Sequence, residues 1–455
     1  MKYIFLTASL ICTVALSSYA QQAPPPNTPV SFSLADCIKY AYEHQDSIKN
    51  ANLDVQSAEY KVKETIGSGL PQINGSISFQ DYIKSPTQVA PVFGANFQIA
   101  DPKAPLVPLP FGPVKYTNNF GLQLNQLIYS GTFLVGLQAV KTFRELSQRS
   151  LVRSKIETNV NVTKAYYQAL VSNEQISLLD ANIAQLKQTL DQTTQQNKQG
   201  FVEKIDVDRL SVQYNNLVTN RDNVQRSLTL NYQMLKFQMG MPVEQDLTLT
   251  DKLGDVNMAE QTAQNAVDTS FYHNRIEYKL LETNVLLNQL DVKSKKANFQ
   301  PTVAFVAGLG NVFQENHFSY LYDRNYYNSF IGLNINIPIF TGGQHLNQMR
   351  QSQISVLKAQ NDLHNASNGF KLQANAAQIT FTNSIQSLNN QKRSRELAQE
   401  VLRVSKIKYQ QGVGSSIEVT QAQTELESSD NQYIQALYNA LISKVDLDKA
   451  YARIN

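Results

Sequence analysis

Residues 198–207 read KQGFVEKIDV, and residues 410–419 read QQGVGSSIEV. In each stretch a Gln-Gly pair, ending in Gly200 or Gly412, closes a long sequence without proline in which apolar residues recur at helical spacing. Glycine ends helices because it readily adopts the positive φ angle that a helix terminus needs. The two stretches therefore predict two sharp turns, each between a long helix and a shorter helix that returns beside it.

The sequence contains an internal repeat, and each copy includes one of these turns. The two Gln-Gly breaks lie 212 residues apart, and two further pairs match: LIYSGT (127–132) with PIFTGG (338–343), and LPQINGSISF (70–79) with QPTVAFVAGL (300–309). Self-similarity of this kind indicates a duplicated architecture. We expect two internal structural repeats, each reading helix, strand, loop, strand, long helix, break, shorter helix.

Each returning helix starts with a serine or an acid. Ser415 or Ser416 can cap the second returning helix, and Ser33 with Asp36 three residues later forms a capping box at the first helix of the chain. Glu418 and Asp206 lie in the first turns of the returning helices, where the helix dipole favours an acid. Dipole stabilisation is therefore one interpretation of both acids, beside any functional one.

Four segments alternate apolar residues with small or polar ones, which is the period of a strand with two unlike faces. They lie near 72–80, 120–128, 302–309 and 330–340. In the last one the apolar positions are Ile331, Leu333, Ile335, Ile337 and Ile339. Such strands have the length and pattern of transmembrane barrel strands. A half-buried sheet of a soluble protein is the alternative.

The loops that join the strand pairs favour the membrane interpretation. Aromatic residues prefer the membrane interface, and these loops carry Tyr82, Phe111, Tyr116, Phe313, Phe318, Tyr320, Tyr322, Tyr326 and Tyr327. The first loop, 81–118, is also rich in proline, as expected of a long external connection. Four strands leave two unpaired edges, so two or three chains must share one closed barrel.

The first twenty residues have the pattern of a secretory signal. Lys2 precedes an apolar run over 3–16 and small residues at the end, so we expect a signal peptide at 1–20. Cys12 follows a branched residue where lipid attachment needs a small one, which disfavours a lipoprotein. Cys37 is then the only cysteine of the mature chain, so no intrachain disulfide forms.

The composition excludes several classes. Charged residues make up 17% of the chain and the net charge is +3, so the basic surface of a nucleic-acid binder is missing. No stretch after residue 20 has the roughly 20 apolar residues of a membrane-spanning helix. The chain lacks phosphate-binding and nucleophile motifs, and its histidines lie on different expected elements: His44, His273, His317, His345 and His364. We therefore expect no enzyme, no catalytic residue, no metal site and no cofactor, and we interpret Asp206 and Asp208 as a helix-start pair.

The helix lengths agree with one another. The long helices expected at 132–198 and 343–410 are each roughly 100 Å long, and the short ones at 34–66 and 203–239 are roughly 50 and 55 Å. Two short helices end to end match one long helix. The lengths predict a wall in which each long helix runs beside two short ones, packed at coiled-coil spacing.

Taken together, the signal, the duplicated halves, YSG and FTGG at strand-to-helix junctions and YQQGVGSSIEVTQAQTEL after a long helix resemble the TolC family of outer-membrane efflux channels. The resemblance runs from about residue 31 to 455. It implies an α+β membrane protein: a trimer whose 12-stranded outer-membrane β-barrel, four strands per chain, continues into a long α-helical coiled-coil barrel. The repeats would span 21–240 and 262–455, with an equatorial linker at 241–261.

The resemblance also implies function. It predicts an outer-membrane channel of a tripartite efflux or type I secretion system, extending into the periplasm. This channel would be a passive conduit in contact with outer-membrane lipid. Its partners would be a periplasmic adaptor (membrane fusion protein) and an inner-membrane pump. A soluble periplasmic coiled-coil adaptor is the alternative, although it leaves the four strands unexplained.

In such channels the tunnel narrows at the hairpin tips. Glu418 matches an acid of the ring at the entrance, and Gln421 stands where a second acid is often found. Tyr409 matches a linking tyrosine, and Asp206 matches an acid of the first tip. Gly414 replaces a basic residue, so we expect weaker contacts in the closed state. Adaptor docking is expected at the tip residues Gly200, Phe201, Val202, Gly412, Val413 and Gly414.

Overall fold

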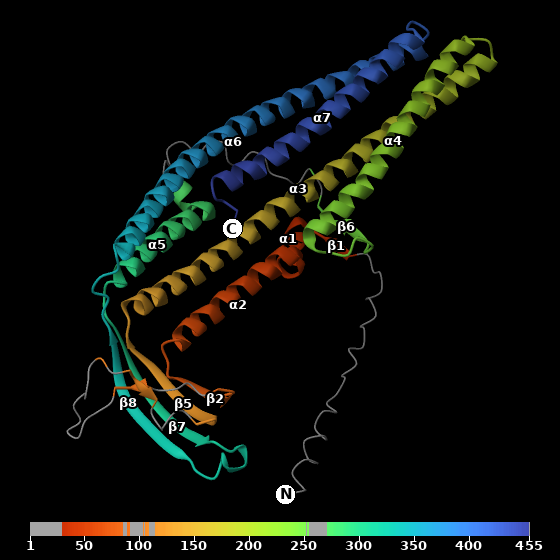
Figure 1. Cartoon of the computed structure of the whole chain (residues 1–455). Coiled ribbons are helices and arrows are strands. Elements are labelled where there is room, and N and C mark those ends of the chain that lie inside the picture. Colours follow the sequence, from red (N-terminus) through yellow and green to blue (C-terminus); the bar gives the residue numbers. More distant parts are fainter. Residues whose placement is uncertain are drawn as a thin grey trace.

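This computed structural model describes residues 30–84, 89–91, 103, 105–108, 114–251, 253 and 271–454. The expected signal peptide at 1–20, with Cys12, lies outside the described residues, as do Phe111 and residues 254–261 of the expected linker. The molecule is elongated: a curved sheet forms one end, and helices run from it to two hairpin tips at the other end (Figure 1).

The sheet has four antiparallel strands in the order β2-β5-β7-β8. Their bounds are β2 (Gln72–Asp81), β5 (Tyr116–Tyr129), β7 (Thr302–Glu315) and β8 (Tyr326–Asn336). The central pair, β5 and β7, comes from the two halves of the chain, so the sheet joins them. Strands β2 and β8 form its edges. Two short pairs complete the strands: β1 (Val30–Phe32) with β6 (Leu247–Leu249), and β3 (Val89–Ala90) with β4 (Val107–Pro108).

The last strand differs from the expected 330–340. It begins at Tyr326 and ends at Asn336, which pairs with Thr302. Ile337 and Ile339 therefore lie beyond the strand, where they are largely exposed. Pro338 accounts for the early end, because proline has no N–H group to continue the ladder.

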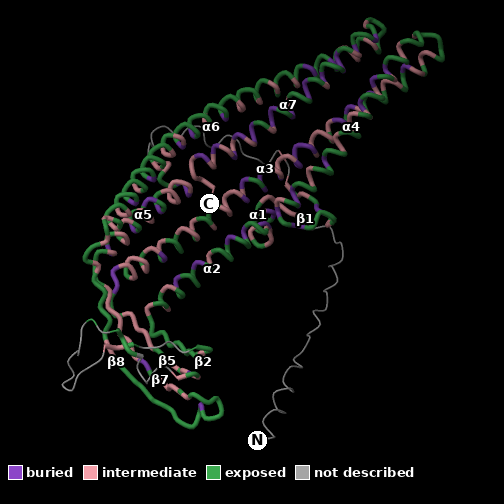
Figure 2. Tube along the Cα trace, viewed as in Figure 1, coloured by how far each residue is buried: buried purple, intermediate pink, exposed green. Residues whose placement is uncertain are grey.

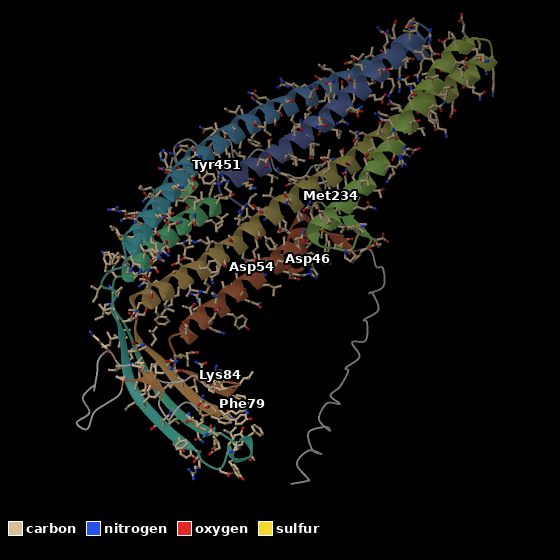
Figure 3. All side chains as sticks on the ribbon, viewed as in Figure 1. Asp46, Asp54, Phe79, Lys84, Met234 and Tyr451 are labelled. Carbon is tan, nitrogen blue, oxygen red and sulfur yellow. The ribbon has the colours of Figure 1, made fainter. Side chains whose placement is uncertain are left out.

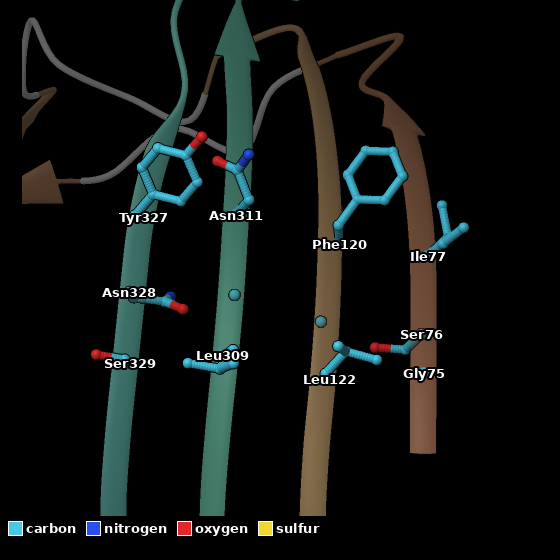
Figure 4. Close-up of a pocket in the computed structure, with 12 residues that line it drawn as sticks. Gly75, Ser76, Ile77, Phe120, Leu122, Leu309, Asn311, Tyr327, Asn328 and Ser329 are labelled. Atoms are coloured by element: carbon cyan, nitrogen blue, oxygen red, sulfur yellow. The ribbon is translucent and has the colours of Figure 1, made fainter. Parts of the chain in front are cut away.

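The strand register gives the sheet one apolar and one polar face. On the apolar face, cross-strand rows contain Ile73 with Leu124, Ala307 and Ile331, and Gly75 with Leu122, Leu309 and Ser329. A third row contains Ile77, Phe120, Asn311 and Tyr327 (Figure 4). The large side chains of this face are open to the surroundings; Ile73 is 70% exposed and Ile331 80% exposed. The other face carries mainly Asn, Gln, Ser and Gly.

Aromatic rings gather at the end of the sheet farthest from the helices. Phe79 lies there (Figure 3), with its ring centroid 6.4 Å from that of Tyr116 and 6.2 Å from that of Phe318. Tyr322 makes a contact of a different kind: its hydroxyl accepts a 2.8 Å hydrogen bond from Asn118 Nδ2. The loop after β7 is thus held against the sheet by rings and by a side-chain hydrogen bond.

Two long helices carry the rest of the fold. Helix α3 (Gly131–Lys198) has 68 residues and α6 (Gln344–Gln410) has 67. Helices α2 (Asp46–Gly67) and α4 (Lys204–Met239) pack along α3, whereas α5 (Ile276–Ala297) and α7 (Ser416–Ala450) pack along α6. Helix α5 contacts α3 as well as α6, and α7 also contacts α3, so α3 has neighbours from both halves of the chain. Buried residues follow the lines of contact between helices (Figure 2).

The helix expected at 34–66 is interrupted. Helix α1 (Leu34–His44) ends before Gln45, whose ψ angle of 124° is extended, and α2 starts after it. Gly240, at the end of α4, lies so close that an added Cβ would be 2.7 Å from the His44 carbonyl oxygen. The side chain of Gln45 donates a 3.1 Å hydrogen bond to the Gln238 carbonyl. The break lets the two chain segments touch backbone to backbone.

The middle of the molecule is held by a mixed core. The Ser33–Asp36 capping box is confirmed at α1, and Cys37 lies fully buried beside it without a disulfide. Burial raises the pKa of the Cys37 thiol to about 12, so it stays protonated. Asp251, in the expected linker, accepts hydrogen bonds from the Tyr166 hydroxyl (2.8 Å) and the Leu34 N–H (3.0 Å).

Gly240 is a position where a single added methyl group should be costly. Its φ of +72° and the nearby His44 and Gln45 backbone both oppose a side chain, so Gly240→Ala should destabilise the fold by at least about 2 kcal/mol. Gly369→Ala, in α6 with open space around it, should be neutral or stabilising. Thermal unfolding of the detergent-solubilised protein measures both; equal melting temperatures would contradict the close contact at Gly240.

Candidate functional site

The two hairpin tips have the same backbone geometry. Gly200 (φ +81°) and Gly412 (φ +74°) each follow a long helix by two residues. At the first tip the Phe201 N–H donates to the Gln196 carbonyl and the Gly200 N–H to the Asn197 carbonyl. The second tip repeats this pair of hydrogen bonds, with donors at Val413 and Gly412 and acceptors at Lys408 and Tyr409. Both helices therefore end in a Schellman motif that needs glycine.

The tips present apolar side chains to the surroundings. Phe201 is 77% exposed and Val413 is 76% exposed, whereas Val202 is half-buried. Gly414 follows Val413 where the chain turns tightly under α6. An added Cβ there would be 3.0 Å from Lys408 Cβ and 3.1 Å from the Tyr409 nitrogen. Gly414 thus has little room for a side chain.

The two serines at the start of α7 have different roles. The Ser415 hydroxyl accepts the Glu418 N–H at 3.3 Å and caps the helix. The Ser416 hydroxyl donates instead to Asp206 in the first turn of α4, which connects the two hairpins. Arg209 on α4 places Nη1 3.9 Å from the same carboxylate oxygen. Asp206 is therefore part of a link between the tips.

Glu418 and Gln421 lie one turn apart on the exposed side of α7, with the buried Val419 and Ala422 on its other side. Tyr409 packs against the apolar cluster that joins α6 to α7. Its hydroxyl is buried and has no hydrogen-bond partner among the described residues. The structure therefore brings Asp206 to Ser416, but it places Glu418, Gln421 and Tyr409 apart from that link.

Three more polar links join the hairpins above the tips. Gln213 on α4 donates to the Thr420 carbonyl (3.4 Å) and the Thr424 hydroxyl (3.3 Å) on α7. Asn182 Nδ2 on α3 donates a 2.8 Å hydrogen bond to Asp430 Oδ2 on α7, and Lys164 Nζ on α3 donates a 2.5 Å hydrogen bond to Asp446 Oδ1 on α7. These links follow the line between α3–α4 and α6–α7 from the tips toward the middle.

Asp430 is the most enclosed acid of these links. It is 7% exposed, and while one carboxylate oxygen accepts from Asn182, the other accepts from Arg395 Nε at 2.7 Å. The Arg395 guanidinium also lies 5.0 Å from the Tyr433 ring centroid. Asp430 thus connects α3, α6 and α7 by charge-assisted hydrogen bonds, which are stronger than neutral ones.

The apolar cores near the tips lie within the hairpins. Leu179, Leu186, Leu210 and Leu217 form one cluster between α3 and α4. Ala398, Leu402, Val419, Ala422 and Leu426 form another between α6 and α7. Only farther from the tips does a cluster with Val171, Ile434, Leu437 and Leu441 join α3 to α7. Near their tips, the α3–α4 and α6–α7 hairpins can therefore separate from each other by breaking polar links, without opening the apolar cluster inside either hairpin.

Sequence reasoning missed most of this network. It named Asp206 but not Ser416, Arg209, Asn182 or Arg395 as partners of an acid. One signal was present: Asp430 occupies a position between Leu426 and Ile434 on the buried stripe of α7, where an acid needs a partner.

Metal-binding clusters and membrane-spanning helices are both absent from the described residues. No group of three or more His, Cys, Asp or Glu side chains that could hold a metal ion occurs in this part of the chain. Within the same residues, none of the helices combines the length and the apolar character needed to cross a membrane.

Comparison with known proteins gives consistent results. The Salmonella enteritidis outer membrane protein TolC is 24% identical over 340 residues, which cover 73% of this chain and 69% of that protein. The Dickeya chrysanthemi proteases secretion protein PrtF is 22% identical, covering 70% and 67%. The fold matches the open state of the Neisseria gonorrhoeae MtrE outer membrane channel with a TM-score of 0.72 at 15% identity, covering 92% of this chain and 88% of that one.

The family model described as outer membrane efflux protein matches residues 37–241 and 281–453. These two segments contain most of both halves, including both hairpin tips. The chain therefore belongs to the outer membrane efflux protein family and is an outer-membrane channel for efflux or type I secretion.

Proposed function

We propose that three copies of this chain form one passive conduit from the periplasm to the exterior, which is opened and closed at the hairpin tips. The observation that carries the proposal is the sheet. The sheet has an exposed apolar face and two open edges, and two long hairpins lie at the other end of the molecule.

The strand order supports closure between copies. An even number of antiparallel strands leaves β2 and β8 running in opposite directions, so β8 of one copy can pair antiparallel with β2 of the next. In lipid the edges must be paired, because no water is present to bond their N–H and C=O groups. Three copies give a barrel of twelve strands with the apolar face toward outer-membrane lipid. The family resemblance supports three rather than two.

The polar links support gating at the tips. The Ser416–Asp206 and Asn182–Asp430 hydrogen bonds hold the hairpins together, while each hairpin keeps its own apolar core. Outward movement of the second hairpin breaks the links and widens the entrance. In the proposed trimer, Glu418 and Gln421 face the axis. Three carboxylates and three amides form the ring at the constriction, and the carboxylates attract cations.

The partners follow from this geometry. The tips lie at the end of the molecule away from the sheet and carry exposed apolar residues, which suits docking of a periplasmic adaptor that connects an inner-membrane pump. The docking residues are Gly200, Phe201, Val202, Gly412, Val413 and Gly414. The soluble adaptor alternative is not supported, because the family match and the four-stranded sheet both favour the channel.

Assembly can be tested by fractionation. The full chain should be recovered with outer membranes, and after extraction in detergent its mass should correspond to three copies. Native mass spectrometry measures the number of chains. A monomer released with the soluble periplasm would contradict the proposal, since its sheet edges would then be unpaired.

Glu418→Gln should lower the cation selectivity of the pore and weaken block by divalent cations, because it removes one negative charge per copy from the ring. Reversal potentials in planar bilayers under a salt gradient measure the effect. Glu396→Gln, an exposed acid on α6, removes the same charge elsewhere and should leave selectivity unchanged. Equal selectivity of the Glu418 variant and the wild type would exclude Glu418 from the constriction.

Ser416→Ala should shift the pore toward its open state. A hydrogen bond to a carboxylate contributes about 1.5–3 kcal/mol, so losing it should raise the open-to-closed ratio by about tenfold or more. Ser415→Ala removes the helix cap but keeps the link to Asp206, so it serves as the control. Single-channel recording at low voltage gives both ratios. If both serine variants open equally often, the Ser416–Asp206 bond does not hold the gate.

A further inference from the structure

The polar face of the sheet carries one phenylalanine within the four strands. Phe330 on β8 lies in the cross-strand row that also contains Asn74, Gln123 and Gly308. The other phenylalanines of these strands belong to the apolar face: Phe79, Phe120, Phe305 and Phe313. The Phe330 side chain is 55% exposed. Because the proposed barrel turns its apolar face to lipid, this ring lies in the water-filled lumen.

Gly308 makes room for the ring. A Cβ added to Gly308 would lie 2.7 Å from Phe330 Cζ and 3.1 Å from Phe330 Cδ1, so the ring occupies the space above the glycine. Asn328 has the same arrangement on the next row of this face. Its side chain extends from β8 toward β7 (Figure 4), and its Cγ would be 3.0 Å from a Cβ added to Gly310. Both side chains therefore lie along the wall, and the Phe330 ring offers an apolar surface to the lumen.

The wall around this ring is uncharged. The charged residues of the four strands are Asp81 and Glu315, and both lie at strand ends on the other face. Asn74 and Gln123, in the row of Phe330, offer neutral amide groups. An exposed ring beside neutral hydrogen-bonding groups suits an uncharged ligand with an aromatic surface. A charged ligand would find no counter-charge in this part of the wall.

We propose that Phe330 is a binding site for neutral, planar aromatic molecules inside the barrel, and that Gly308 sets the orientation of its ring. The inference rests on the proposed function, which places the polar face in the lumen, and it adds a class of ligand. Aromatic rings attract one another when they stack with an offset or meet edge to face. This attraction strengthens binding by about two- to tenfold beyond the effect of burying area. Such weak binding retains a molecule and still lets it leave, as conduction requires.

Tryptophan fluorescence tests the site directly. The chain contains no tryptophan, so a single introduced one reports on its own surroundings. Phe330→Trp keeps an aromatic ring at the site. Caffeine, a neutral planar heteroaromatic compound, is the probe, and glucose is a neutral probe of similar size without an aromatic ring. In the detergent-solubilised assembly, caffeine should quench the fluorescence of Phe330→Trp to a plateau, whereas glucose should leave it unchanged.

Ile331→Trp is the matched control, because Ile331 is the next residue, lies on the apolar face and is 80% exposed. Caffeine should quench this variant in proportion to its concentration, without a plateau. Adding Gly308→Ala to Phe330→Trp should displace the ring and raise the caffeine concentration for half-maximal quenching by about two- to tenfold. Saturation-transfer NMR of caffeine checks the native ring, since Phe330→Leu should give a weaker signal than the wild type.

The binding site is excluded if caffeine quenches both tryptophan variants alike, or if Phe330→Leu binds caffeine as well as the wild type does. An equal plateau with glucose would also overturn the proposal, because the site would then accept polyhydroxy compounds. An unchanged half-maximal concentration after Gly308→Ala would overturn the role of Gly308. Pore formation in planar bilayers shows that each variant has assembled. If Phe330→Trp forms no pores, the NMR comparison of the wild type with Phe330→Leu decides.

Failure of the binding site can be separated from failure of the channel itself. In liposomes with brominated phospholipids, Ile331→Trp should be quenched and Phe330→Trp should not, because the bromine atoms lie within the lipid. The reverse pattern would place the polar face in lipid and contradict the proposed function. The expected pattern without saturable quenching by caffeine would overturn the binding site alone.

Discussion

The two unpaired edges of the four-stranded sheet are the constraint on which the rest of the structure depends. In lipid, β2 and β8 must pair with other strands, because unsatisfied backbone N–H and C=O groups are costly there. In the proposed assembly the chain does not close its own sheet, so several copies share one barrel. Because β5 leads into α3 and β8 leads into α6, both long helices leave the same sheet, and α5 packs against both of them.

In the proposed channel the helices must be rigid along their length and movable at their ends. Near the tips, the apolar clusters lie inside α3–α4 and inside α6–α7, and these pairs are joined by side-chain hydrogen bonds such as Ser416–Asp206 and Asn182–Asp430. Breaking polar links in water costs little compared with exposing a packed core. Farther up, the cluster around Leu441 joins the hairpins, so the proposed movement would be confined to the tips.

Local signals predicted the local structure. The positive φ of Gly200 and Gly412 and the Ser33 capping box depend on residues within a few positions, so the sequence was sufficient for them. The break at Gln45 was not predictable, since it depends on Gly240, nearly 200 residues later. The Ser416–Asp206 link could not be predicted for the same reason. Its partners are 210 residues apart, and Ser415 and Ser416 look equivalent until the tips are placed side by side.

Gly414 shows how a departure from the family pattern is explained by the structure. The basic residue that the resemblance leads us to expect there would be crowded, because the added Cβ would lie 3.0 Å from Lys408 Cβ and 3.1 Å from the Tyr409 nitrogen. Arg209, on the same helix as Asp206, places a guanidinium near that carboxylate, and Ser416 supplies the hydrogen bond across the tips. The acid therefore keeps a cation and a donor although Gly414 offers neither. The cation belongs to the first hairpin itself, so the contact of Asp206 with the second hairpin depends on the Ser416 hydroxyl. A hydrogen bond from this neutral donor is easier to break than an ion pair between the hairpins would be.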